Sequence, residues 1–203
     1  LGAYLDYVHY RYPFWAKLDE YNQANYTRRG DHFYYGIKAA LARYNLERLS
    51  NGLPDVEVID YTKPINGVVP PAPLVQYVST LEKRLLEAID AGYVFDSNFT
   101  KYSLRDPLSI EILGRIVEGN ADSINKDYYG SYYRSLLSLA VAPNSVTPAS
   151  SFSNPAYYKV AKRVATILDQ FKEKLEPYSR DELLLPGVKV ESLTIDKLVT
   201  FFD

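Results

Sequence analysis

The segment from residue 28 to 56, RRGDHFYYGIKAALARYNLERLSNGLPDV, restricts the fold more than any other part of the chain. Its apolar residues recur at spacings of three and four, which places them on one face of an α-helix. They are Phe33, Ile37, Ala40, Leu41 and Tyr44. Asp31 suits the first turn of this helix, Gly52 suits its left-handed end, and Pro54 prevents its continuation. We therefore expect a helix over residues 31–51 with one buried face.

The same spacing of apolar residues recurs along most of the chain, so we expect a mainly α fold, a bundle of helices. Asp106 and Asn154 each precede a proline, and this pair of residues is typical of a helix start. Between the helices, prolines at positions 54, 64, 70, 71 and 73 indicate a long loop. The further helices that we expect are one in the opening segment that ends at Pro13, and others over residues 77–91, 107–118, 126–141 and 155–176.

The last residues of the chain have a different pattern. Val188, Val190, Leu193 and Ile195 lie in short runs rich in β-branched residues after Gly187, and such runs favour strands. We therefore expect a helical domain over residues 1–180 and the start of a β-rich domain over residues 181–203. The opening residues have the pattern of a helix interior, so we also expect the chain to be a fragment of a longer protein.

Composition excludes several kinds of function. The chain of 203 residues contains no cysteine, so it has neither disulfides nor thiol catalysis. Its formal net charge is -2, with acids and bases mixed along the chain, which provides no basic surface for nucleic acid. No apolar run approaches the roughly 20 residues needed to cross a bilayer. Asp6, His9 and Arg11 also exclude a signal peptide at the start of this sequence.

Tyrosine is unusually abundant: the chain has 20 tyrosines and 8 phenylalanines, but no methionine and one tryptophan. Tyrosine commonly fills cores and interfaces while its hydroxyl finds a hydrogen-bond partner. A second interpretation is that the protein is a reservoir of aromatic amino acids. The sequence leaves both interpretations open.

Three blocks of residues resemble the arthropod haemocyanin superfamily. They are RRGD at 28–31, FYY at 33–35 and ARYNLERLSNGL at 42–53. The superfamily contains haemocyanins, prophenoloxidases and insect hexamerins, and the aromatic load is most similar to the arylphorin type of hexamerin. The resemblance implies a haemocyanin-like middle domain that runs into an immunoglobulin-like β domain. It also implies a protein secreted into the haemolymph that forms homo- or hetero-hexamers with like subunits.

The copper proteins of the superfamily that this chain resembles are understood to bind two coppers, each through three histidines. Carried over one position at a time, the ligands fall here on Leu5, His9 and Ile37 for the first copper, and on Tyr133, Leu137 and Ala161 for the second. Only His9 keeps an imidazole, the side chain that suits copper. The whole chain has two histidines, His9 and His32, which cannot make a three-histidine site. We therefore expect no metal, no cofactor and no catalytic residue.

The remaining polar features have simple interpretations. A lone histidine such as His9 is more often hydrogen-bonded in the core than a ligand, and we expect His32 at the surface. Asp55, Glu57 and Asp60 form an acidic loop that we expect to be solvated.

Two triplets match the N-glycosylation pattern. They are Asn25-Tyr26-Thr27 and Asn98-Phe99-Thr100, and neither contains proline. Both fall in predicted loops, so Asn25 and Asn98 are candidate glycosylation sites.

We interpret the sequence as part of a non-enzymatic storage protein of insect haemolymph, an aromatic-rich amino-acid reservoir that has lost copper binding. The alternative is a carrier of small hydrophobic ligands of the hormone type, because periodicity does not distinguish an apolar cavity from a packed core. A third interpretation, a copper oxygen carrier or a phenoloxidase, requires the missing histidines. We expect like subunits as partners, with no nucleic acid and no membrane insertion.

Overall fold

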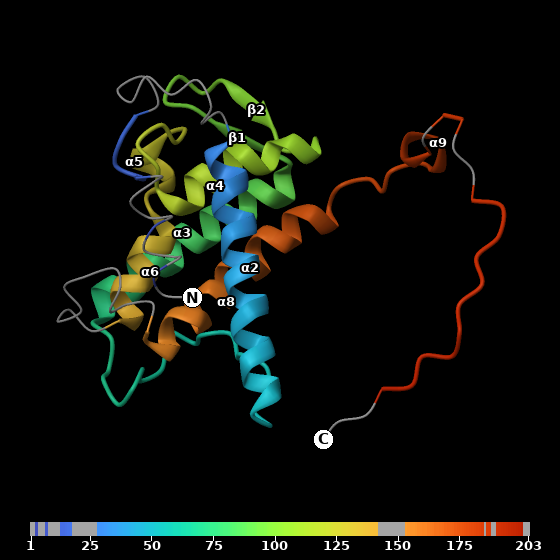
Figure 1. Cartoon of the computed structure of the whole chain (residues 1–203). Helices are drawn as coiled ribbons and strands as arrows, with labels where there is room; N and C mark the ends of the chain where they lie inside the picture. The colour runs from blue at the N-terminus through green and yellow to red at the C-terminus, as the bar shows by residue number, and fades with distance from the viewer. Residues whose placement is uncertain are drawn as a thin grey trace.

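The structure is a computed structural model that describes residues 3, 7, 13–17, 28–141, 153–184, 186–187 and 190–200. It is mainly helical (Figure 1). In order, its elements are α2 (Arg29–Ser50), α3 (Ala72–Ala91), β1 (Tyr93–Phe95), β2 (Lys101–Ser103), the 3-10 helix η1 (Pro107–Ser109), α4 (Ile110–Glu118), α5 (Lys126–Tyr129), α6 (Tyr132–Ala140), α8 (Pro155–Glu173) and α9 (Arg180–Leu183). The mainly α class predicted from the sequence is confirmed.

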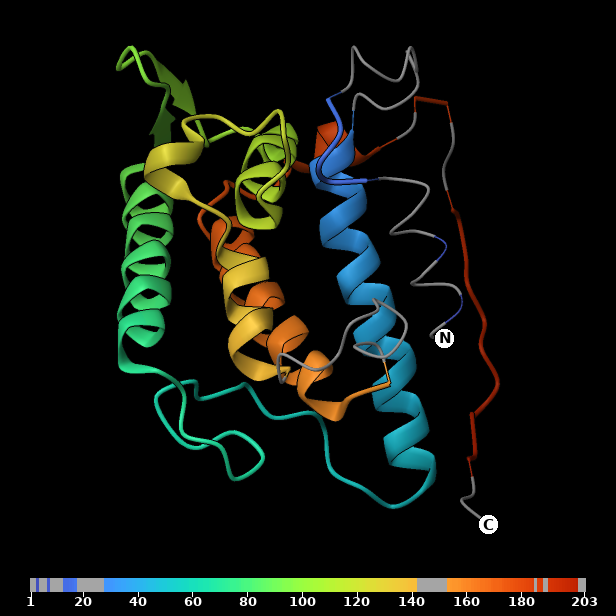
Figure 2. The same cartoon turned by 90° about the vertical axis from the view of Figure 1, so that its left-hand side faces the viewer.

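The long helices form a bundle. In Figure 2, α6 and α8 lie between α3 on one side and α2 on the other. The core is built from the apolar faces of α2, α3, α4, α6 and α8. None of the helices in the described ranges combines the length and the apolar character that crossing a membrane requires.

Helix α2 confirms the prediction for residues 31–51, with a start two residues earlier. Phe33, Ile37, Ala40 and Leu41 are buried, and Tyr44 stacks on Tyr158 of α8 at 3.7 Å between ring centroids. The helix ends as predicted, because Gly52 adopts a left-handed φ of 67°. The backbone N–H of Gly52 then bonds to Leu49 O and that of Leu53 to Arg48 O, at 3.0 and 2.9 Å, which satisfies the last carbonyls of the helix.

The contact between α2 and α4 is a backbone-to-backbone crossing at two glycines. A Cβ added at Gly30 would lie 2.0 Å from the carbonyl oxygen of Glu111, and one at Gly114 would lie 2.3 Å from the carbonyl oxygen of Gly30. Any side chain at either position would separate the two helices. The N-terminal end of α2 is therefore fixed against α4, which sets the direction in which the buried stripe of α2 faces.

Two predicted helices differ in detail. Helix α3 begins at Ala72, five residues before the expected start, and Pro73 lies in its first turn. The helix expected over residues 126–141 is divided into α5 and α6, because Gly130 adopts φ 67° and ψ −145°. A Cβ at Gly130 would lie within 3.0 Å of the Leu81 side chain, so glycine also allows α3 to approach closely.

Both of the helix starts that were predicted from a capping residue followed by proline are confirmed. The Asp106 carboxylate accepts a bond from the backbone N–H of Leu108, and the Asn154 side chain accepts one from that of Ala156. After Asp106 the first turn is the 3-10 helix η1, and α4 follows it. Helix α8 ends at Glu173, three residues before the expected end.

A short hairpin of β1 and β2 was not predicted. The two strands pair antiparallel with Tyr93 opposite Ser103 and Phe95 opposite Lys101. Each strand has only three residues, and Val94 is the only fully buried residue of the two. A strand that buries a single side chain has no alternating pattern, so periodicity could not reveal it.

The β-rich domain expected over residues 181–203 stays a prediction. Residues 190–200 are exposed and have no regular structure, so the strands predicted from Val190, Leu193 and Ile195 do not form in this part of the chain. A strand needs a neighbour to accept its backbone hydrogen bonds, and these residues have none among those described. Val188, and most of the helix expected to end at Pro13, lie outside the described residues.

Candidate functional site

Four of the positions that the family resemblance assigns to copper ligands lie on three helices of the bundle. Ile37 is on α2, Tyr133 and Leu137 are one turn apart on α6, and Ala161 is on α8. Helix α8 packs against both α2 and α6. Ile37 and Ala161 are buried, with 5% and 0% of their surfaces exposed, and the other two pack against the core. The other two positions, Leu5 and His9, lie outside the described residues.

Tyr133 is the only one of these four side chains with a polar group. The rings of Phe33 and Tyr133 pack edge to face, with 5.1 Å between their centroids. The hydroxyl shares a hydrogen bond with that of Tyr157 on α8. Burial, and then the neighbouring Tyr157 phenol and its hydrogen bond, raise the pKa of Tyr133 well above its ordinary value. The phenol therefore stays protonated and joins α6 to α8 as a neutral hydrogen-bonding group.

A buried ion pair lies beside these positions. Arg29, in the first turn of α2, contacts both carboxylate oxygens of Glu118 at the end of α4, with an Nε to Oε2 distance of 3.0 Å. Burial raises the pKa of Glu118, and the charge of Arg29 and hydrogen bonds from Arg29 and Asn120 oppose that rise. Both carboxylate oxygens are engaged by the guanidinium, so the pair joins two helices.

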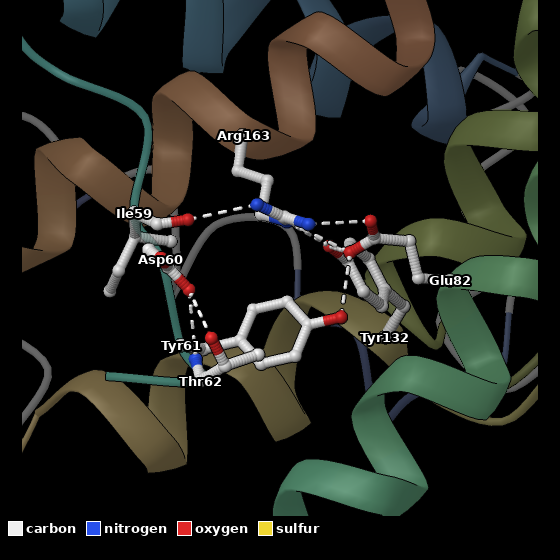
Figure 3. Close-up of polar contacts among 7 residues, drawn as sticks. All are labelled: Ile59, Asp60, Tyr61, Thr62, Glu82, Tyr132 and Arg163. Carbon is white, nitrogen blue, oxygen red and sulfur yellow. Dashed lines mark hydrogen bonds and ion pairs between the residues drawn. The ribbon is translucent and has the colours of Figure 1, made fainter. Parts of the chain in front are cut away.

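A second polar cluster lies on the α3 side of the bundle (Figure 3). We call the four side chains Glu82, Arg163, Tyr132 and Tyr61 the Glu82 cluster. Arg163 donates from Nη2 to Glu82 Oε1 at 2.6 Å and from Nε to Glu82 Oε2 at 2.8 Å. The Tyr132 hydroxyl also donates to Glu82 Oε2, and that of Tyr61 does so at 3.3 Å. These bonds connect α3, α6, α8 and the loop after α2.

The same arginine holds the loop through its third nitrogen. Arg163 Nη1 donates to the carbonyl oxygen of Ile59 at 2.9 Å, and the guanidinium lies 4.6 Å from the centre of the Tyr61 ring. The neighbouring Asp60 carboxylate accepts from the Thr62 hydroxyl at 2.6 Å, which shapes the turn that presents Tyr61 (Figure 3). The long proline-rich loop is thus attached to the bundle at a defined point.

The electrostatics of the Glu82 cluster are those of a satisfied structural network. Burial alone would raise the pKa of Glu82, but hydrogen bonds from Arg163 and Tyr132 and the charge of Arg163 outweigh it, so the pKa is lowered. Burial and the neighbouring carboxylate raise the pKa of Tyr132. The cluster therefore keeps a charged carboxylate, a charged guanidinium and neutral phenols at physiological pH.

The sequence contained a signal for this cluster. Glu82 follows Val78 by four residues and precedes Leu85 by three, which is the spacing of the buried stripe. Arg163 likewise lies three residues after Val160 and four before Ile167. A charge of each sign within an apolar stripe on two helices indicates a buried ion pair.

The other predicted features lie at the surface. His32 is exposed on α2. The acidic loop residues are exposed but form ion pairs: Asp55 with Lys162 at 3.6 Å, Glu57 with Lys159 at 3.2 Å and Asp60 with Lys63 at 2.9 Å. Two of these pairs attach the loop to α8.

The sequon residue Asn98 is exposed at the tip of the hairpin. The Asp96 carboxylate accepts bonds from the backbone N–H groups of Asn98 and Thr100, both at 2.9 Å. The intervening Phe99 has a left-handed φ of 63°. The other sequon residue, Asn25, lies outside the described residues.

A known protein family matches most of the chain. The sequence profile described as "Hemocyanin, copper containing domain" matches residues 1–71 and 69–168. The chain therefore belongs to the haemocyanin copper-containing domain family.

Insect proteins named as hexamerins and storage proteins are among the relatives of the chain. Over its full length it is 36% identical to "Allergen Cr-PI" of Periplaneta americana and 33% identical to "Hexamerin 70c" of Apis mellifera. It is 30% identical to "Sex-specific storage-protein 1" of Bombyx mori, again over its full length. The chain covers 35%, 34% and 32% of these three proteins, so it spans about a third of the length of the curated relatives it matches.

Two solved structures share the fold. A scorpion haemocyanin in its activated state superposes with a TM-score of 0.77 at 24% identity, over 94% of this chain and 36% of that one. A crustacean haemolymph-type prophenoloxidase superposes with a TM-score of 0.73 at 21% identity, over 90% of this chain and 34% of that one. The predicted haemocyanin-like middle domain is thus confirmed as the fold.

The residues present do not fit the copper that the family description implies. The described positions carry two aliphatic side chains, one methyl group and a phenol that keeps its proton, and none of these replaces an imidazole. Within the described ranges, no group of three or more histidine, cysteine or acidic side chains could hold a metal ion. The whole sequence supplies two histidines.

Proposed function

We propose that the chain is the helical middle domain of an insect haemolymph storage protein in which copper binding has been lost. The observation that carries this proposal is the chemistry of Ile37, Tyr133, Leu137 and Ala161. A dicopper centre needs imidazole nitrogens directed inward from facing helices. These positions instead carry side chains that pack as core, without buried unpaired polar groups. The protein then keeps the scaffold and performs no oxygen chemistry.

The tyrosine content supports the storage role. Several tyrosines are structural, because Tyr34, Tyr129 and Tyr132 are among the largest fully buried side chains. Others are largely exposed: Tyr35, Tyr77 and Tyr178 are exposed over 53%, 48% and 58% of their surfaces. Exposed aromatic residues add little to stability, so a load beyond what the core needs fits a reservoir of aromatic amino acids.

The wider organisation follows from the same proposal. The full-length protein is secreted into the haemolymph and assembles as a hexamer of like subunits, homo- or hetero-oligomeric. Residues 1–180 form its helical domain, and residues 181–203 begin an immunoglobulin-like β domain. The alternating apolar residues of the tail support this boundary, because they gain strand partners only when more of the sheet is present. Asn98 and Asn25 carry N-glycans.

Metal content and activity test the loss of copper. The full-length protein is purified without chelators, its copper is measured by mass spectrometry, and oxidation of a catechol is assayed after proteolytic activation. We expect no stoichiometric copper, no copper-peroxide absorption band in air and no oxidation of the catechol. Two bound coppers per subunit, or catechol oxidation that a copper chelator abolishes, would overturn the proposal.

An isotope experiment tests storage itself. Larvae receive the full-length protein labelled with heavy tyrosine, and tissue proteins are analysed after metamorphosis. We expect the labelled protein to disappear from the haemolymph and its tyrosine to appear in newly made protein. Persistence of the intact labelled chain into the adult would contradict a storage role.

A further inference from the structure

The chain contains two Asn-Gly pairs, and the structure holds them in different ways. They are Asn51-Gly52, directly after α2, and Asn66-Gly67, in the loop between α2 and α3. In Figure 2 this loop runs below the helices, from the end of α2 to the start of α3. All four residues are exposed, so access to water does not distinguish the two pairs.

An Asn-Gly pair can react with itself, and asparagine is one of the thermolabile residues. The backbone nitrogen of the glycine attacks Cγ of the asparagine, a bond forms between these two atoms, and the bond from Cγ to Nδ2 breaks. Ammonia leaves with the proton of the glycine N–H, and a cyclic succinimide remains. Water then adds to one of the two succinimide carbonyl carbons and opens the ring, which produces aspartate or isoaspartate. Glycine permits this attack because it has no Cβ beside the nitrogen.

Hydrogen bonds oppose this reaction at Asn51. Its Nδ2 donates to the carbonyl oxygen of Glu47 at 2.7 Å, which holds the side-chain amide against α2. The attacking nitrogen is also engaged, because the N–H of Gly52 donates to the carbonyl oxygen of Leu49 at 3.0 Å. Both bonds satisfy carbonyl groups at the end of α2, so the reaction must first unwind the last turn of the helix.

Neither reacting group is engaged in this way at the second pair. Among the residues that the structure describes, no hydrogen bond involves the side-chain amide of Asn66 or the N–H of Gly67. A Cβ added at Gly67 would meet nothing within 4 Å, so the space beside this residue is open. The turn is closed by two backbone bonds between Ile65 and Val68, of 2.8 and 2.9 Å.

The turn at Asn66 can open without disturbing the bundle. Asn66 and Gly67 have positive φ angles of 51° and 80°, as in the two-residue turns that join paired strands. Here a single isolated bridge takes the place of the strands. Val68 and Val69 are already exposed over 65% and 74%, so opening uncovers little further apolar surface. The nitrogen of Gly67 can therefore reach Cγ of Asn66 through a local fluctuation.

We propose that Asn66 is a site of spontaneous deamidation in the native protein, and that the end of α2 protects Asn51 from the same reaction. Each event replaces a neutral amide by a carboxylate and adds one negative charge. Isoaspartate also adds a carbon atom to the backbone of a two-residue turn, so the bridge between Ile65 and Val68 is lost. In a store that persists without renewal, the modified fraction measures the age of the protein; this consequence alone rests on the proposed function.

Ageing of the full-length protein tests the site. The protein is incubated in warm neutral buffer and then digested with trypsin for a short time in mildly acidic buffer, which preserves the remaining amides. One tryptic peptide, residues 49–83, contains both pairs, because trypsin does not cut between Lys63 and Pro64. We expect Asn66 to lose its amide at least about tenfold faster than Asn51, the factor that one or two hydrogen bonds supply. Equal rates, or faster loss at Asn51, would overturn the proposal.

Unfolded peptides separate the effect of structure from that of sequence. Synthetic peptides of residues 49–54 and 64–69 contain the two pairs without the fold, and we expect comparable rates in both. An intact Asn66 in the folded protein, after the 64–69 peptide has converted, would also overturn the proposal.

Matched variants identify the product. An isoaspartyl methyltransferase transfers a labelled methyl group from S-adenosylmethionine to isoaspartate, and the label in the 49–83 peptide is measured. Asn66→Gln should remove most of this label from the aged protein, whereas Asn51→Gln should leave it unchanged. The reverse pattern would contradict the site. None of these outcomes bears on the storage role, which the isotope experiment tests separately.

Discussion

Arg163 on α8 and Glu82 on α3 form a two-point ion pair inside the bundle, with nitrogen-to-oxygen distances of 2.6 and 2.8 Å. The two residues are 81 positions apart in sequence. The Glu82 side chain is exposed over 14% and that of Arg163 over 24%, so water screens the pair only partly. Because Arg163 also holds the Ile59 carbonyl, the pair joins two helices and the long loop.

Removing one partner should destabilise the fold. Glu82→Ala leaves the Arg163 guanidinium in the bundle without its counter-charge, and we expect a loss of about 2–4 kcal/mol in the free energy of unfolding. Urea denaturation measures it. The control is Glu87→Ala on the same helix, whose side chain is exposed over 59% and should change stability by less than about 0.5 kcal/mol. Equal losses in the two variants would contradict a special role for the buried pair.

The same carboxylate should contribute to acid sensitivity. Its folded-state pKa lies below the ordinary value of 4.5, so the unfolded chain binds more protons as the pH falls below that value. The contribution of Glu82 is therefore fully present above pH 4.5 and is lost as the pH falls through the folded pKa. Urea unfolding from pH 6 to pH 3 should show a shallower decline for Glu82→Gln than for the wild type. Parallel curves would show that Glu82 does not carry this effect.

The glycine crossing should not tolerate a methyl group. Gly30→Ala places a Cβ against the Glu111 carbonyl, and separating α2 from α4 should cost about 3 kcal/mol or more. Gly36→Ala is the matched control in the same helix, because nothing lies within 4 Å of an added Cβ there. That change should stabilise the protein by about 0.5–1 kcal/mol. Thermal unfolding compares the two, and similar effects would refute the crossing.

The phenol at the predicted copper position should stabilise the interior. Tyr133→Phe removes the hydrogen bond to Tyr157 and leaves the Tyr157 hydroxyl buried without it, which should cost about 1–2 kcal/mol. Tyr35→Phe provides the comparison at an exposed hydroxyl, and its effect should stay below about 0.5 kcal/mol. A Tyr133→Phe variant as stable as the wild type would show that this hydrogen bond contributes nothing.

Asn98 should carry a glycan when the protein is secreted from insect cells. The hairpin tip exposes the asparagine, and Thr100 completes the sequon. Glycopeptide mass spectrometry should find the modified Asn98 peptide in the wild type and in Thr100→Ser, which keeps the sequon. Thr100→Ala should abolish it. An unmodified Asn98 in the secreted wild type would refute this site.

Most helices could be predicted because their signals are local. The spacing around Phe33 and Ile37, the left-handed Gly52 and the proline after Asn154 each act within a few residues. Glu82 could have been placed inside from its spacing, but its partner on α8 is far away in sequence. The division of residues 126–141 depends on the close approach of Leu81 to Gly130, which no local pattern records.

The sequence by itself determined the helical class, the ends of α2 and the scarcity of imidazole. Two histidines cannot make a three-histidine site in any arrangement. Only the tertiary structure decided that Glu82 faces Arg163, that Gly30 touches α4 and that Tyr133 bonds to Tyr157. The physical reason is that periodicity records which face of a helix is apolar, whereas the cost of burying a charge or hydroxyl depends on partners brought from other helices.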